Sequence, residues 1–160
     1  MGTKKAAESN DRVIATNRRA RHDFDIEQTY EAGIQLTGSE VKVLRTGKAS
    51  LQDSYGTVRG GEVFAYGIHI PEYPQASYNN HEPTRPRKLL LHGDEIHKIT
   101  VRTEQQGYTL VPLKLYFKGN KVKVQLAVAR GRKRHDKRQA IAEREAKREI
   151  QRRTGTRRSL

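Results

Sequence analysis

One stretch decides the fold: LKLYFKGNKVKVQLAV, residues 113–128. Apolar and polar residues alternate on both sides of Gly119-Asn120, and this period of two is typical of strands with one buried face. A Gly-Asn pair between two such runs favours a two-residue hairpin turn. The stretch therefore predicts an antiparallel hairpin, and with it a mainly β protein.

The same pattern predicts four more strands upstream of this hairpin. Residues 24–34 open with Phe24 and Ile26 alternating with charged residues. Residues 54–59 and 62–70 flank Gly60-Gly61, which favours a second hairpin turn. Residues 88–92 are short and apolar. Together with the final hairpin, the sequence predicts about six antiparallel strands.

Two segments carry helix signals instead. Thr37 and Glu40 have the spacing of a capping box, in which each side chain bonds the other residue's backbone amide. This predicts a short helix over residues 38–46, with Gly47 as its stop. Apolar residues at helical spacing predict a second helix over residues 94–106.

These elements predict a closed, antiparallel, six-stranded OB-like barrel with short flanking helices. Each strand has one apolar face, and closure removes the unpaired edges that a flat sheet would expose. Residues 71–87 hold four of the five prolines and are expected to form a loop on this barrel.

Composition limits the class of protein. The chain has 160 residues, 32 Lys and Arg against 18 Asp and Glu, and a net charge of +14. This length suits one domain with tails, and no apolar run reaches the ~18 residues that a membrane span needs. The absence of Cys excludes disulfides and thiolate chemistry. We expect a soluble, cytoplasmic, monomeric protein with a polyanionic partner, nucleic acid first.

The charge is uneven along the chain. Residues 130–160 hold 13 basic and four acidic residues, and Ile141 and Ile150 are the only large apolar residues from Gln139 to Arg153. We therefore expect a flexible N-terminal arm over 1–11, an RNA-binding barrel over 12–129 and a basic C-terminal tail over 130–160. The tail should be disordered in the free protein and helical when RNA neutralises it.

Catalytic motifs are absent from the sequence. The segment around Gly47-Lys48 lacks the first glycine of a phosphate-binding loop, since position 42 is Lys42. His92 and His97 are five residues apart and do not share a helical face. We expect no enzyme activity, no metal and no cofactor.

Two basic clusters indicate RNA binding. Residues 17–22 read NRRARH, and residues 79–88 read NNHEPTRPRK. Guanidinium groups suit phosphate, while amides and imidazoles can bond base edges or 2′-hydroxyls. The alternative for each cluster is a solvated polar segment without a partner.

Several motifs in order along residues 12–152 resemble one family. They are NRRARHDF (17–24), TYEAG (29–33), GSEVKVLR (38–45), DSY (53–55), NHEPTRPRKLLLH (80–92), TLVPLKLYFK (109–118) and the segment from Ala129 to Arg138. The chain resembles the small protein B (SmpB) family, the tmRNA-binding proteins of bacterial trans-translation. Ser50 stands where that family often has Asn, and residues 154–160 match nothing in it.

The resemblance implies a barrel that binds the tRNA-like domain of tmRNA and supports its alanylation by alanyl-tRNA synthetase. Carried over by motif, the RNA-facing residues are Asn17, Arg18, Arg19, Arg21, His22, Glu31, Lys42, Arg45, Lys48, Asn80, His81 and Arg85. Glu31 is an acidic residue among cations, and it would either accept a hydrogen bond from RNA or buttress Arg45.

The resemblance also implies delivery of tmRNA, with elongation factor Tu and GTP, to the A site of stalled ribosomes. The tail would then occupy the decoding centre and the empty mRNA channel of the small ribosomal subunit. The tail residues carried over are Gly131, Arg132, Lys133, His135, Asp136, Lys137 and Arg138. Two alternatives fit the composition as well: a ribosomal structural protein, or a general single-strand RNA-binding barrel.

Overall fold

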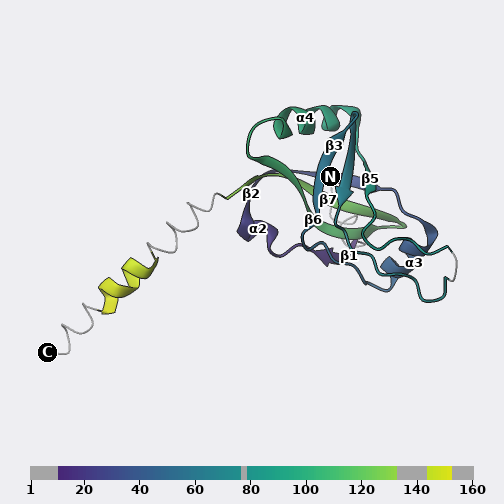
Figure 1. The fold of residues 1–160 in the computed structure, drawn as a ribbon, viewed down its shortest axis with the longest axis horizontal. Helices are drawn as coiled ribbons and strands as arrows, with labels where there is room; N and C mark the ends of the chain where they lie inside the picture. Colours follow the sequence, from purple (N-terminus) through teal and green to yellow (C-terminus); the bar gives the residue numbers. More distant parts are fainter. Residues whose placement is uncertain (1–10, 77–78, 133–143, 153–160) are drawn as a thin grey trace, which may run out of the picture.

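A ring of six antiparallel strands forms the centre of the computed structural model, which describes residues 11–76, 79–132 and 144–152 (Figure 1). In ring order the strands are β6 (Tyr108–Lys118), β3 (Tyr55–Arg59), β4 (Glu62–Tyr66), β5 (Arg87–Leu90), β2 (Phe24–Ile34) and β7 (Lys121–Gly131), which returns to β6. The prediction of a mainly β, antiparallel fold is confirmed, as are the two hairpins, β3–β4 and β6–β7.

The ring closes unevenly. β6 and β7 pair along their whole length, whereas β3 meets β6 only where Gly56 lies opposite Leu110. A Cβ atom on Gly56 would lie 2.8 Å from the Cβ of Leu110, so a side chain at this position would push the two strands apart. The ring therefore closes at this point through a glycine.

A seventh strand corrects the predicted strand number. β1 (Asp11–Thr16) pairs with β6, from Asp11 opposite Lys118 to Thr16 opposite Lys114. A one-turn helix, α2 (Ala20–Asp23), follows it and was not predicted either. Residues 11–16 show little alternation, and their pairing partners lie about a hundred residues away, so local pattern could not reveal this strand.

The two predicted helices are present with shifted ends. α3 (Gly38–Arg45) begins at the predicted capping box, and α4 (Gly93–Thr103) begins at a second one formed by His92 and Glu95. The predicted strand 62–70 ends earlier, at Tyr66, because Gly67 turns the chain with a φ of +77°.

The core fills the ring, and a smaller cluster lies outside it. Leu110, Leu115, Leu126, Val124 and Val63 are fully buried inside, together with Leu44 of α3 and Ile99 of α4. On the outer face, Ala20 of α2 packs on Val111, Leu113, Ala127 and Ala129. Figure 1 shows the result: α4 lies on one side of the ring, and α2, β1 and α3 follow one another along the opposite side.

Residues 144–152 form a helix whose residues are all exposed. It lies within the part of the tail whose composition favours helix; residues 133–143 and 153–160 lie outside the described residues. The division into arm, barrel and tail stays a prediction. Within the described ranges, no helix has the length and apolarity that crossing a membrane requires.

Candidate nucleic-acid interface

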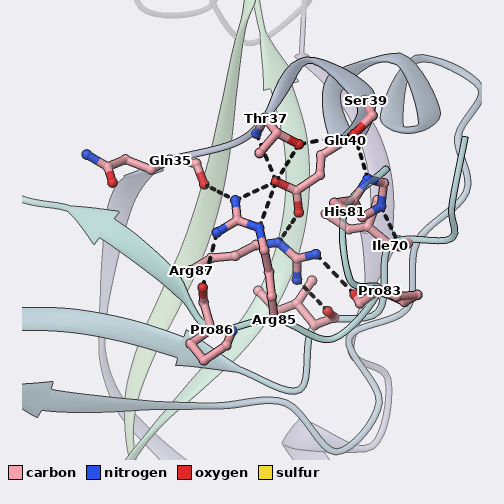
Figure 2. Close-up of polar contacts among 11 residues, drawn as sticks. Gln35, Thr37, Ser39, Glu40, Ile70, His81, Pro83, Arg85, Pro86 and Arg87 are labelled. Carbon is pink, nitrogen blue, oxygen red and sulfur yellow. Dashed lines mark hydrogen bonds and ion pairs between the residues drawn. The ribbon is translucent and has the colours of Figure 1, made fainter. Parts of the chain in front are cut away.

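The carboxylate of Glu40 lies at the centre of a buried polar cluster at the start of α3 (Figure 2). Its Oε1 atom accepts a hydrogen bond from the Thr37 amide at 2.8 Å, which is one half of the capping box. Oε1 also accepts from Nη2 of Arg85 at 2.5 Å, and Oε2 accepts from Nε of Arg87 at 2.5 Å. These bonds fasten α3 to β5 and to the loop before it.

The Glu40 carboxyl stays ionised in this cluster. Burial would by itself raise its pKa, but the hydrogen bonds from Arg85, from the Thr37 amide and from Arg87 outweigh burial and lower the pKa below its ordinary value. Arg87 is fully buried too, and its other nitrogens donate to the carbonyl oxygens of Ile68 and Pro83. The buried charges are therefore paired and hydrogen-bonded, which is what makes their burial tolerable.

Asn80 and His81, two predicted RNA contacts, have their polar atoms bonded within the protein. The Asn80 amide accepts from the Tyr73 backbone at 3.0 Å and donates to the carbonyls of Tyr73 and Ala76. His81 is 6% exposed, and its ring nitrogens lie 2.8 Å from Ser39 Oγ and 2.9 Å from the Ile70 carbonyl oxygen (Figure 2). Asn80 therefore shapes the proline-rich loop, and His81 holds this loop against α3. Their role as RNA contacts stays a prediction.

Seven of the predicted residues are exposed and form a basic band along one side of the ring. Arg18, Arg19, Arg21 and His22 lie on α2 and the turn before it, and Lys42, Arg45 and Lys48 lie on α3 and the turn after it. Arg12 of β1 joins the two groups, because its Nη2 donates to the Arg45 carbonyl at 3.0 Å. The band therefore follows α3, β1 and α2, the side opposite α4 (Figure 1).

Two adjoining grooves run along this band. One, of about 310 Å³, lies between residues 15–19 and residues 49–52. The next, of about 500 Å³, is lined by Arg19, Phe24, Tyr55 and Arg132 among others. Asn17 and Gln52 line both grooves. The band is thus a hollowed, cationic surface, which suits a polyanion better than a flat one.

Asn17, which lines both grooves, is hydrogen-bonded to the backbone on either side of them. Its side-chain amide donates to the Pro112 carbonyl at 3.1 Å and to the Leu51 carbonyl at 3.4 Å, and its backbone amide donates to Leu113 at 2.7 Å. The residue is half-buried. It therefore ties the turn before α2 to β6 and to the residues after α3.

Glu31 lies on the outer face of β2 and is bonded to two residues of β6. Its Oε2 accepts from the Tyr116 hydroxyl at 2.5 Å, and its Oε1 lies 3.1 Å from Nζ of Lys118. The Tyr116 bond is the main reason that the pKa of Glu31 lies below its ordinary value, and Lys118 lowers it further. The carboxylate is thus bonded to Tyr116 and Lys118, and the two predicted roles of Glu31, an RNA contact or a buttress of Arg45, stay predictions.

Gly131 and Arg132, the first two of the tail residues carried over by motif, are bonded to the barrel. Gly131 is the last residue of β7, and the Arg132 amide donates to the Asp23 carbonyl at 3.1 Å. The Arg132 side chain donates to Asp25 at 3.2 Å. The other predicted tail residues, Lys133, His135, Asp136, Lys137 and Arg138, lie outside the described residues.

Sequence reasoning missed the parts played by Arg12 and Arg87. Arg87 had a signal: it stands two residues before Leu89, so it points to the same buried face of β5. Arg12 had none, since its contact with Arg45 depends on a strand that local pattern did not reveal.

An antiparallel barrel with a hollowed cationic band on one side is typical of small nucleic-acid-binding proteins. Among the described residues, no group of three or more His, Asp or Glu could hold a metal ion. Comparison with known proteins narrows the class. The family model described as "SmpB protein" matches residues 14–156, so the chain belongs to the SmpB family.

Named relatives agree with this assignment. An SsrA-binding protein of Acidothermus cellulolyticus is 57% identical over 152 residues, which cover 95% of this chain and 96% of the relative. One of Acetivibrio thermocellus is 56% identical over 147 residues, covering 92% and 96%. A solved structure described as "tmRNA-SmpB: a journey to the center of the bacterial ribosome" has a TM-score of 0.65 and 46% identity, and covers 79% of this chain and 92% of that one. The family resemblance predicted from sequence is confirmed.

Proposed function

We propose that this protein binds the tRNA-like domain of tmRNA through the basic band. The observation that carries the proposal is the band itself, a run of exposed arginines and lysines along α3, β1 and α2. Phosphate contacts of this kind position a protein on folded RNA and supply most of the affinity. The names of the relatives, SsrA-binding proteins, support tmRNA as the RNA.

The band is rigid before the RNA arrives. Glu40 fastens α3 to Arg85 and Arg87, and Asn17 fastens the turn before α2 to β6. Since the cations sit on elements that are already ordered, little conformational entropy is lost on binding. In this proposal Glu40, Asn17, Asn80 and His81 position the surface, and the exposed cations contact the RNA.

The bound tmRNA is then charged by alanyl-tRNA synthetase and delivered, with elongation factor Tu and GTP, to the A site of a stalled ribosome. The tail beyond Arg132, of which residues 144–152 are already helical, enters the decoding centre and the empty mRNA channel and is helical along its length there. Its support is the charge of residues 130–160, with 13 basic and four acidic residues. These partners place the protein in the cytoplasm, where it acts as a monomer without a cofactor.

The test compares the full chain with a truncation after Arg132, which keeps all of β7. We expect both to bind the tRNA-like domain with similar affinity, and ordinary tRNA and single-stranded RNA to compete poorly. Only the full chain should support peptide tagging on stalled ribosomes. Equal competition by single-stranded RNA would favour a general RNA-binding barrel, and stoichiometric co-purification with unstalled ribosomes would favour a ribosomal structural protein.

A further inference from the structure

Tyr55 presents an exposed aromatic ring on the outside of the barrel. The residue is 47% exposed, one of few large hydrophobic side chains on the described surface. Its ring stacks on the ring of Tyr66 across the β3–β4 hairpin, with centroids 5.4 Å apart and 12° between the planes. Arg59 donates a hydrogen bond to the Tyr66 hydroxyl at 3.0 Å. One face of the Tyr55 ring is thus supported, and its orientation is set by the hairpin.

The larger groove of the basic band is where Tyr55 lies. Tyr55 lines this groove and Tyr66, on which its ring stacks, does not. The guanidinium residues Arg19 and Arg132 line the same groove. An exposed aromatic residue and two arginines therefore line one groove of about 500 Å³.

We propose that this groove takes one unpaired nucleotide of an RNA, whose base stacks on Tyr55 and whose phosphate is held by Arg19 and Arg132. This inference deepens the proposed function and rests on it. Stacking on an aromatic side chain combined with a guanidinium on the phosphate is the general way in which proteins hold single nucleotides.

The charges of the groove favour a nucleotide over an apolar or acidic peptide. Asp23 and Asp53 also line it and balance the charges of Arg19 and Arg132, so the groove itself favours a ligand with one phosphate over one with several. One phosphate fits the two arginines, and the carboxylates suit the amino and imino donors of a base. A peptide carboxylate would leave the aromatic face unused.

Two RNAs could supply this nucleotide. The groove is continuous with the band proposed to bind the tRNA-like domain, which is one source. Arg132 lies at the point where the chain leaves β7 for the tail, so small-subunit ribosomal RNA near the tail is the other. The chemistry is the same in both cases, and the experiment separates them.

The first measurement uses fluorescence. The chain has no Trp, so Tyr55→Trp introduces a single indole at the groove. We expect its emission to be quenched when a base stacks on it. Val101→Trp is the matched control, because Val101 is 49% exposed and lies on α4, away from the band. Each variant of the full chain is titrated with the isolated tRNA-like domain and, separately, with small ribosomal subunits.

Quenching of Tyr55→Trp by the tRNA-like domain supports the proposal with tmRNA as the source, and quenching that needs the subunit supports it with ribosomal RNA. Absence of quenching with both overturns it, and so does equal quenching of Val101→Trp. A gel shift on the unsubstituted protein runs alongside. If that protein fails to bind the tRNA-like domain, the proposed function is wrong. The titration of Tyr55→Trp with small ribosomal subunits still tests whether a base stacks in the groove.

The second measurement is the binding affinity of Tyr55 variants for the RNA that quenched the fluorescence of Tyr55→Trp. Tyr55→Phe should bind like the original, and Tyr55→Leu should bind roughly 5- to 150-fold more weakly, the range for loss of one stacked base. The salt dependence of binding should not change, since no charge is removed. An equal loss of affinity in Tyr55→Phe and Tyr55→Leu, or a changed salt dependence, overturns the stacking proposal. Thermal melting of both variants shows whether each keeps the fold.

Discussion

Nε of Arg87 lies 2.5 Å from Oε2 of Glu40, and neither side chain has any exposed surface. The two residues are 47 positions apart in the chain. Their pairing joins the first turn of α3 to the first residue of β5, so it couples the helix that carries part of the basic band to the wall of the ring. A buried ion pair of this kind is costly to break on one side, because the remaining charge stays buried without a partner.

Glu40→Gln should therefore destabilise the protein by about 3–5 kcal/mol, the usual cost of removing one partner of a buried pair. Urea unfolding at neutral pH measures it. Glu62→Gln is the matched control: Glu62 pairs with Lys88 at 2.8 Å, but Glu62 is exposed and Lys88 is only half-buried. That change should cost less than about 1 kcal/mol. Equal costs for the two variants would mean that the buried pair contributes no more than a surface pair.

Acid should weaken the fold through the same carboxylate. The pKa of Glu40 is lower in the folded protein than its ordinary value of 4.5, so the unfolded chain takes up this proton more readily. The resulting stability is fully present above pH 4.5 and is lost as the pH falls through the folded-state pKa. The free energy of unfolding, followed from pH 7 down to pH 3, should drop less steeply in Glu40→Gln than in the unsubstituted protein. Parallel curves would assign the acid sensitivity to other carboxylates.

Local pattern predicted what depends on neighbouring residues. The β6–β7 hairpin follows from alternation around Gly119-Asn120, and the start of α3 follows from the Thr37 and Glu40 capping box. The same reasoning could not predict that Glu40 is buried, because that depends on Arg87, which alternation alone would place only on a face of β5. It also could not predict that Asn80 and His81 are bonded within the protein, because polar residues in a loop carry no sign of the backbone groups that they bond.

Asn17 and Arg18 are neighbours with different predicted roles, which a pair of alanine variants can separate. Asn17→Ala removes hydrogen bonds to the carbonyls of Pro112 and Leu51, so it should lower stability by about 0.5–1.5 kcal/mol. Arg18→Ala removes an exposed cation, so stability should stay unchanged while affinity for the tRNA-like domain falls. Thermal melts and gel shifts on both variants measure this. Loss of RNA affinity without loss of stability in Asn17→Ala would make Asn17 a direct RNA contact.

Tyr116 should control the ionisation of Glu31. Its hydroxyl donates to the Glu31 carboxylate at 2.5 Å and is the largest cause of the lowered pKa. Tyr116→Phe should therefore move the pKa of Glu31 up toward its ordinary value of 4.5, as followed by NMR titration of the side-chain carboxyl. The control is Tyr55→Phe, which changes a tyrosine away from Glu31 and should leave the titration of the Glu31 carboxyl unchanged. An unmoved midpoint in Tyr116→Phe would mean that the nearby lysines, Lys118 and Lys123, hold the carboxylate ionised without the tyrosine.

Salt dependence should show that binding uses the basic band rather than the overall charge of +14. The double variant Arg18→Gln, Arg21→Gln removes two exposed cations from the band, and the double variant Lys98→Gln, Arg102→Gln removes two from α4 on the opposite side. Each lost phosphate contact should reduce the slope of log K against log salt by about 1. We therefore expect a slope smaller by about 2 in the first variant and an unchanged slope in the second. Equal reductions in both would mean that the tRNA-like domain responds to net charge and that no one face of the barrel is selected.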